Sequence, residues 1–139
     1  MPAERSIQRI KDLLYAHGAV AIEVGEAPQQ ETIQIKFLRR IVVDKKELMQ
    51  PMRVSVTFKG RKPAEAMRML YYYLKAKWDA VDWGLISAEE AFLAYFMGTL
   101  PDGRQTTVGE MMLPDIARGR LPDMAPFKAP QLPGGDGRD

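Results

Sequence analysis

Residues 52–83, MRVSVTFKGRKPAEAMRMLYYYLKAKWDAVDW, change from one hydrophobic period to another within a few positions. Over Met52–Lys59 apolar and polar residues alternate, which predicts a β-strand with one face in the core. From Pro63 to about Trp83 apolar residues recur every three or four positions, which predicts a long helix; proline suits its first turn because the fixed φ fits there. A strand followed closely by a helix that can cover it indicates the centre of an α+β fold.

The residues before this segment predict one more helix and two more strands. In Glu4–His17 the apolar residues fall on one helical face and charged residues fill the other. Alternation of apolar and polar residues predicts half-buried strands over Val20–Val24 and Thr32–Leu38. Residues 41–43 either extend the second of these strands or form a short strand of their own. Residues 45–51 are predicted to be a connection.

The residues after the long helix predict two shorter helices. Ser87–Glu90 has the capping-box pattern and starts a helix that we expect to end at Gly98. Leu100–Gly103 is typical of a β-turn, because proline presets φ at its second position and glycine closes it. Thr107–Glu110 is a second capping box and predicts a short helix, which Pro114 kinks or ends.

Together these elements predict one α+β domain over residues 1–120. It contains an N-terminal helix, an antiparallel sheet of three strands, or four if residues 41–43 stand alone, and a long central helix with two short ones. Residues 121–139 hold four prolines and three glycines with little periodicity. This composition predicts a flexible tail.

Composition excludes several classes of protein. The 139 residues include no cysteine, which excludes disulfides, zinc-thiolate sites, iron–sulfur clusters and cysteine nucleophiles. No apolar run approaches the ~20 residues that span a bilayer, and the first residues lack a signal-peptide pattern. We therefore expect a cytoplasmic protein without a membrane partner.

Candidate catalytic groups are few. His17 is the chain's one histidine, and its place in the last turn of the first predicted helix favours capping of carbonyls over general-base chemistry. The chain has neither of the usual glycine-rich phosphate-binding motifs. We therefore expect a protein that is not an enzyme and has no cofactor.

A set of carboxylates near the end of the central helix has two interpretations. Their spacing allows a hard-cation site, whereas a solvated helix end followed by a capping box accounts for the same residues. We favour the second interpretation and expect no metal. The residues are Asp79, Asp82, Glu89 and Glu90.

The net charge of +2 conceals an uneven distribution. Residues 34–62 carry nine basic and two acidic side chains, a net charge of +7, and the rest of the chain carries −5. Because strand alternation directs part of this set away from the core, the outer face of the sheet is predicted to be basic and to suit phosphate groups. A solvated face that deters edge pairing is the alternative. The candidate nucleic-acid-binding residues are Lys36, Arg39, Arg40, Arg53, Lys59, Arg61 and Lys62.

The central helix has apolar residues on two sides. One stripe suits the sheet, and the opposite side carries Met69, Tyr73 and Trp83. Either later helices of the same chain or another protomer must cover this second face. We therefore name these three residues as a candidate protein interface.

Several short runs beyond the middle of the chain resemble a family of short uncharacterised proteins from phages, prophages and bacterial chromosomes. That family has a run like IKAKLEAVxxGIxxxEEEFLxxxxLPDGRTVGE followed by a proline; the similarity is close over about residues 68–124, although Gln105–Thr106 looks inserted. The resemblance implies a helix, a small antiparallel sheet, a helical C-terminal half and a mobile-element setting, but no activity. The matching runs are Lys75–Lys77, Gly84–Ile86, Glu89–Glu90, Phe92–Leu93, Leu100–Arg104 and Thr107–Glu110.

Two functional hypotheses remain. The favoured one is a non-enzymatic accessory protein, in a phage or prophage setting, whose basic sheet face binds nucleic acid or a nucleic-acid-processing partner. The alternative is a self-associating or protein-binding module that uses the second face of the central helix.

Overall fold

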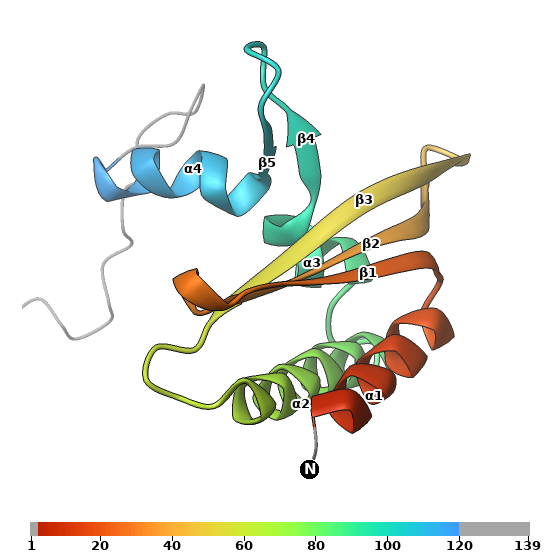
Figure 1. Cartoon of the computed structure of the whole chain (residues 1–139). Coiled ribbons are helices and arrows are strands. Elements are labelled where there is room, and N and C mark those ends of the chain that lie inside the picture. Colours follow the sequence, from red (N-terminus) through yellow and green to blue (C-terminus); the bar gives the residue numbers. More distant parts are fainter. Residues whose placement is uncertain (1–2, 120–139) are drawn as a thin grey trace, which may run out of the picture.

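The computed structural model describes residues 3–119, so the tail predicted over residues 121–139 lies outside the described residues. Helices and strands follow one another as an α-β-β-β-α unit, a short helix, a small hairpin and a last helix (Figure 1). Their bounds are α1 Ala3–Ala16, β1 Ala19–Ala27, β2 Thr32–Val43, β3 Lys46–Thr57, α2 Pro63–Asp82, α3 Ala88–Phe92, β4 Met97–Thr99, β5 Gln105–Thr107 and α4 Val108–Ala117.

The main sheet is an antiparallel meander in the order β1-β2-β3. Helices α1 and α2 lie side by side against one of its faces, and the β4–β5 hairpin and α4 lie on the other side (Figure 1). The predicted α+β class, the antiparallel sheet and the long central helix are confirmed. Within residues 3–119, no helix has the length and apolar character needed to cross a membrane.

The core lies between the sheet and the two helices. Apolar residues at alternate positions of β2 and β3 meet the sheet-facing stripe of α2, as the helical period predicts. Burying each large apolar side chain here contributes on the order of 1.5–3 kcal/mol. The core includes Ile10, Leu14, Ile33, Ile35, Phe37, Met52, Val54, Met67, Leu70, Leu74, Trp78 and Phe92.

The connection predicted over residues 45–51 is wrong, because β2 and β3 form one long hairpin. Val43 pairs with Lys46, and Asp44 and Lys45 between them have positive φ values of 51° and 64°. A two-residue turn with both φ values positive matches the twist of the strands, so pairing continues to the tip. Residues 41–43 thus extend β2 and form no fourth strand.

The segment after α2 also differs from prediction. The expected helix to Gly98 ends early: α3 stops at Phe92, a single 3-10 turn follows over Leu93–Tyr95, and the chain enters β4. The predicted turn at Leu100 closes the β4–β5 hairpin. The Leu100 amide donates to the Arg104 carbonyl at 2.8 Å, and the Leu100 carbonyl accepts from the Gly103 amide at 2.8 Å. Both predicted capping boxes are present. Helix α4 continues beyond Pro114 to Ala117.

Candidate functional site

The outer face of the sheet carries a row of alternating charges. In register, Glu23 of β1 lies opposite Lys36 of β2, which lies opposite Arg53 of β3. Arg53 forms an ion pair with Glu110 at the start of α4. The two cations of this row are therefore flanked by two carboxylates, which reduces the positive potential that the sequence predicts here.

Arg39 and Arg40 separate from this row. Arg39 stands at an alternate position of β2 that faces the core, as Ile35 and Phe37 do, so it does not lie on the outer face. Its Nε donates to the His17 carbonyl at 2.8 Å, and its guanidinium lies 4.9 Å from the Trp78 ring centre. Burial lowers the pKa of the Arg39 guanidinium, and Glu89 partly offsets this effect. Arg40 pairs with Glu47 at 3.3 Å on the exposed part of the hairpin. Neither arginine extends a basic field.

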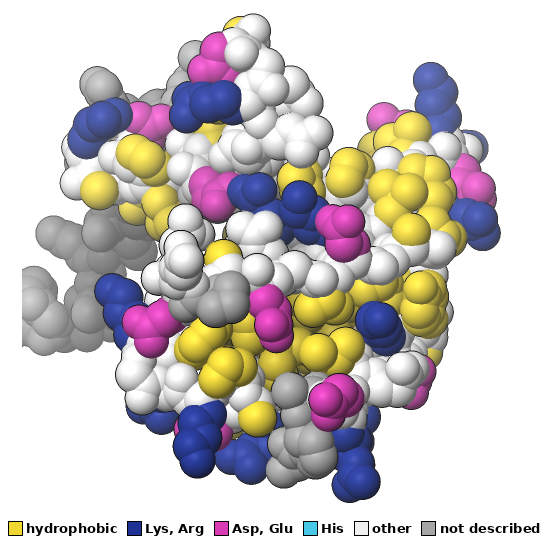
Figure 2. Space-filling view, in the orientation of Figure 1, with side chains coloured by type: hydrophobic (Ala, Val, Ile, Leu, Met, Phe, Trp, Pro, Cys, Tyr) yellow, Lys and Arg dark blue, Asp and Glu magenta, His cyan; other side chains and the backbone are white. Residues whose placement is uncertain are grey.

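The remaining predicted cations gather elsewhere. Lys59, Arg61 and Lys62 lie in the exposed connection between β3 and α2, and within residues 3–119 they form no ion pair. In the view of Figure 2, Lys and Arg side chains stand in small groups beside Asp and Glu side chains, without one continuous basic field. The structure thus divides the predicted set into the charge row, the two separated arginines and this connection.

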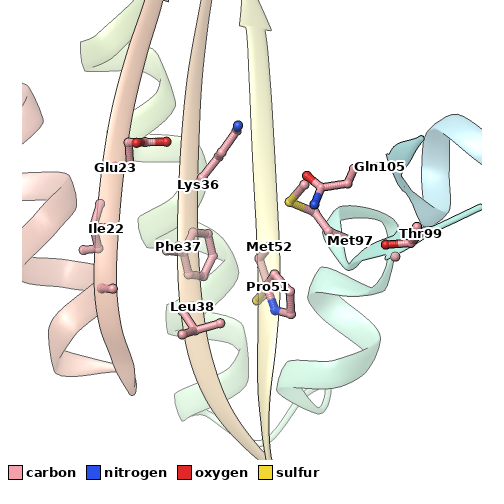
Figure 3. Close-up of a pocket in the computed structure, with 12 residues that line it drawn as sticks. Ile22, Glu23, Lys36, Phe37, Leu38, Pro51, Met52, Met97, Thr99 and Gln105 are labelled. Atoms are coloured by element: carbon pink, nitrogen blue, oxygen red, sulfur yellow. The ribbon is translucent and has the colours of Figure 1, made fainter. Parts of the chain in front are cut away.

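A first groove of about 430 Å³ lies between the outer face of the sheet and the β4–β5 hairpin. Figure 3 shows Glu23 and Lys36 on β1 and β2, Pro51 on β3, and Met97 and Gln105 across the groove on the hairpin. The Gln50 side-chain amide (Nε2) donates to the Met97 carbonyl at 3.1 Å and helps to hold the hairpin beside β3. The charged side chains that line this groove are Glu23 and Lys36, so the lining has no preference for an anion.

A second, larger groove of about 600 Å³ lies where the free edge of β3 meets α2; we call it the β3-edge groove. One side is the backbone and side chains of residues 54–58, and the other is the second face of α2. Met69, Tyr73 and Tyr95 supply its apolar wall, and its charged lining residues are Arg61, Glu65 and Arg68. It combines an unpaired strand edge with exposed apolar side chains.

Tyr73 and Tyr95 are held in place by a polar clamp. Their hydroxyl groups share a hydrogen bond, and the Lys77 ammonium lies 5.2 Å from the ring centre of Tyr73 and 5.8 Å from that of Tyr95. Lys77 also donates to the Ala91 carbonyl at 2.8 Å. Burial, and then the bond with Tyr73, raise the pKa of the Tyr95 phenol, so it stays neutral and presents an uncharged wall.

The three residues of the candidate protein interface lie on the second face of α2. Met69 and Tyr73 are 63% and 43% exposed and line the β3-edge groove. Trp83 is 82% exposed just after the end of the helix and does not line the groove. The structure therefore brings two of the three residues to one concave site. Sequence patterns missed the contribution of Tyr95, which lies in a 3-10 turn where a longer helix was predicted.

His17 has the structural role that its position predicts. Its Nδ1–H donates to the Leu13 carbonyl at 2.8 Å, and Nε2 lies 3.0 Å from Asp82. Its ring stacks on Trp78 with centroids 4.3 Å apart. The imidazole thus closes the end of α1 against the end of α2, and the prediction that it caps the helix is confirmed.

The four carboxylates considered as a cation site each interact with a different group of the protein. Asp79 pairs with Lys75 at 2.9 Å, Asp82 with His17, and Glu89 lies 3.7 Å from Arg39. Glu90 completes the cap of α3. Within residues 3–119 no group of three or more His, Cys, Asp or Glu side chains is placed to hold a metal ion.

The runs that resemble the phage-associated family lie in the second half of α2, in the connection between α2 and α3, in α3 and the start of the 3-10 turn after it, in the β4–β5 hairpin and at the start of α4. No protein-family model, curated protein or solved structure matches the chain. The resemblance, and the mobile-element setting that it implies, stay predictions.

Proposed function

We propose that this chain is a non-enzymatic protein-binding module that acts in the cytoplasm and uses the β3-edge groove as its binding site. The observation that carries the proposal is the meeting of exposed Met69 and Tyr73 with the free edge of β3 in one groove of about 600 Å³. Grooves of this size, lined by aromatic and apolar side chains with a few polar groups, are typical binding sites. Tyr and Met are also enriched at the centres of protein interfaces.

The test is selection of peptides from a random displayed library on the immobilised full chain. Selected peptides should lose at least about tenfold in affinity for Met69→Asn, because an amide in the groove wall removes apolar contact. Met111→Asn is the matched control, since Met111 is also about half exposed but lies on α4 outside the groove. If no peptide is selected, or if both variants bind all selected peptides as the wild type does, the proposal fails.

A second candidate function is binding of nucleic acid, in a phage or prophage setting, and one observation favours it. Lys59, Arg61 and Lys62 are exposed together just before α2, and among the described residues no carboxylate pairs with them. A phosphate backbone that neutralises them would release counterions. Fluorescence anisotropy with single- and double-stranded oligonucleotides should then show affinity that falls steeply as salt rises. Absence of binding at ~50 mM salt would exclude this function.

A further inference from the structure

We propose that the β3-edge groove binds an extended peptide that adds to β3 as an extra strand, with apolar side chains toward α2 and acidic side chains between them. This inference rests on the proposed function, because it names the partner of the same groove. Strand addition obtains affinity from main-chain hydrogen bonds and specificity from pockets that accept alternate side chains.

The backbone of β3 directs hydrogen-bonding groups to its free edge. The Phe58 amide donates to the Glu31 carbonyl beside β2 at 2.9 Å, and successive residues of an antiparallel strand point their backbone groups alternately to either side. Those of Ser55 and Thr57 therefore point away from β2. Pro51 also stands at one of the alternate positions that point away from β2, as expected, because proline has no N–H to donate to β2. Within residues 3–119 no strand lies beyond β3 at Ser55 and Thr57.

The open part of the edge has a defined length. At one end Met52 forms a β-bridge with Phe96, which covers the edge there. At the other end the Arg61 amide donates to the Phe58 carbonyl at 2.8 Å, and the chain turns toward α2. The open stretch is thus residues 54–57, enough for a short extended segment.

The face of the added strand that turns toward α2 would meet apolar surface. Val54 and Val56 of β3 line the groove together with Met69, Tyr73 and Tyr95. Since side chains of a strand alternate between faces, every second side chain of the peptide would contact this wall. An alternating apolar pattern therefore fits the groove better than a helix, which could not pair with the backbone of Ser55 and Thr57.

Charge favours an acidic peptide over a second copy of this chain. Lys59 follows Ser55 and Thr57 at the next alternate position, on the side of the sheet to which the acidic side chains of the peptide would turn, and it forms no ion pair among the described residues. Arg61 and Arg68 line the groove together with Glu65, whose carboxylate accepts from the Lys62 amide. Antiparallel pairing of two β3 edges about Val56 would bring Arg53 opposite the Lys59 of a second copy. Like charges opposite each other disfavour this register, whereas acidic side chains of a peptide would complement Lys59.

The experiment uses the full chain and a fluorescein-labelled acetyl-EVEVEVE-amide peptide in anisotropy titrations. Two further peptides carry N-methyl groups on alternate backbone amides, one at the odd and one at the even positions. Because only one set of amides can face β3, one methylated peptide should lose at least about tenfold in affinity and the other should stay within about twofold. A KVKVKVK peptide should bind at least about tenfold more weakly than the acidic one.

Protein variants locate the site and separate the two proposals. Met69→Asn should weaken binding of the acidic peptide, and Met111→Asn should not. Binding that depends on Met69 but is equally insensitive to both methylation patterns would overturn strand addition and leave the proposed function standing. The same holds if library peptides bind at Met69 and the acidic peptide does not bind at ~1 mM. A stable dimer by light scattering, with the groove closed to every peptide, would overturn the acidic partner in favour of a second copy.

Discussion

Arg53 of β3 and Glu110 of α4 form an ion pair that joins the main sheet to the C-terminal hairpin and helix. The same carboxylate accepts from the Thr107 amide at 2.9 Å and so completes the cap of α4. Burial alone would raise the pKa of the Glu110 carboxyl, but the Thr107 bonds and the Arg53 charge outweigh burial and lower that pKa. This single side chain neutralises one cation of the outer face and anchors a helix.

We predict that Glu110→Gln lowers stability most at neutral pH. A carboxyl whose pKa is lower in the folded state adds stability above its unfolded pKa, about 4.3, and this stability is lost as pH falls through the folded pKa. The carboxylate is half exposed, so the charge contribution is at most about 1 kcal/mol. Urea unfolding from pH 7 to ~3 should show a difference between wild type and variant that shrinks on acidification.

The control for this prediction is Glu47→Gln, because Glu47 pairs with Arg40 where both side chains are more than half exposed. Its effect should be near zero at every pH. A Glu110→Gln difference that is constant with pH, or that grows in acid, would show that the charge of Glu110 does not stabilise the folded state.

Truncation of Trp78 should lower the free energy of unfolding strongly, whereas truncation of Trp83 should leave it almost unchanged. Trp78 is 1% exposed and packs between His17 and Phe92, whereas Trp83 is 82% exposed. Trp78→Ala should cost about 3–5 kcal/mol, because it leaves a large cavity. Trp83→Ala should change the free energy of unfolding by no more than about 0.5 kcal/mol. Urea denaturation measures both, and similar losses would contradict the arrangement of α2.

The elements that could be predicted are those whose signals are local and periodic. The stripe of α2 that packs on the sheet repeats at the helical period over the whole of Pro63–Asp82, and both capping boxes depend on residues three positions apart. The second face of α2 was recognised as apolar and in need of a partner. Its own sequence could not show that Met69 and Tyr73 would meet the free edge of β3.

The features that escaped prediction depend on weak turns or on tertiary contacts. Asp44–Lys45 lacks the Asn-Gly or Asp-Gly pattern of a tight hairpin, so residues 45–51 looked like a connection. Strands β4 and β5 are too short to show alternation. The charge row on the outer face ends in the Arg53–Glu110 pair because α4 returns to β3, a contact between residues far apart in the chain. Net charge by segment cannot report such pairing.

Arg39 and Arg40 provide a matched test of the predicted basic face. Arg39→Ala should lower stability by about 1–3 kcal/mol, because it removes a charged donor from the His17 carbonyl and a cation from the Trp78 ring. Arg40→Ala should cost no more than about 0.5 kcal/mol, since its pair with Glu47 is exposed.

The Arg39→Ala variant also bears on nucleic-acid binding. If oligonucleotides bind at the β3–α2 connection, Arg39→Ala leaves their affinity unchanged, whereas replacing Lys59, Arg61 and Lys62 by Gln weakens it and reduces its salt dependence. Anisotropy titrations at several salt concentrations measure both effects. If the folded Arg39→Ala protein bound oligonucleotides more weakly than the wild type, Arg39 would belong to the binding surface.

His17 should contribute to stability through three separable contacts. His17→Phe keeps an aromatic ring to stack on Trp78 but loses the bond to the Leu13 carbonyl and the contact with Asp82. We expect it to cost about 1 kcal/mol, and His17→Ala about 2 kcal/mol, because the stack is lost as well. Asp82→Asn tests the contact with the His17 Nε2 alone and should cost less than about 1 kcal/mol, since Asp82 is largely exposed. Urea unfolding at pH 7 ranks the three variants, and a His17→Ala protein as stable as the wild type would show that the imidazole does not join α1 to α2.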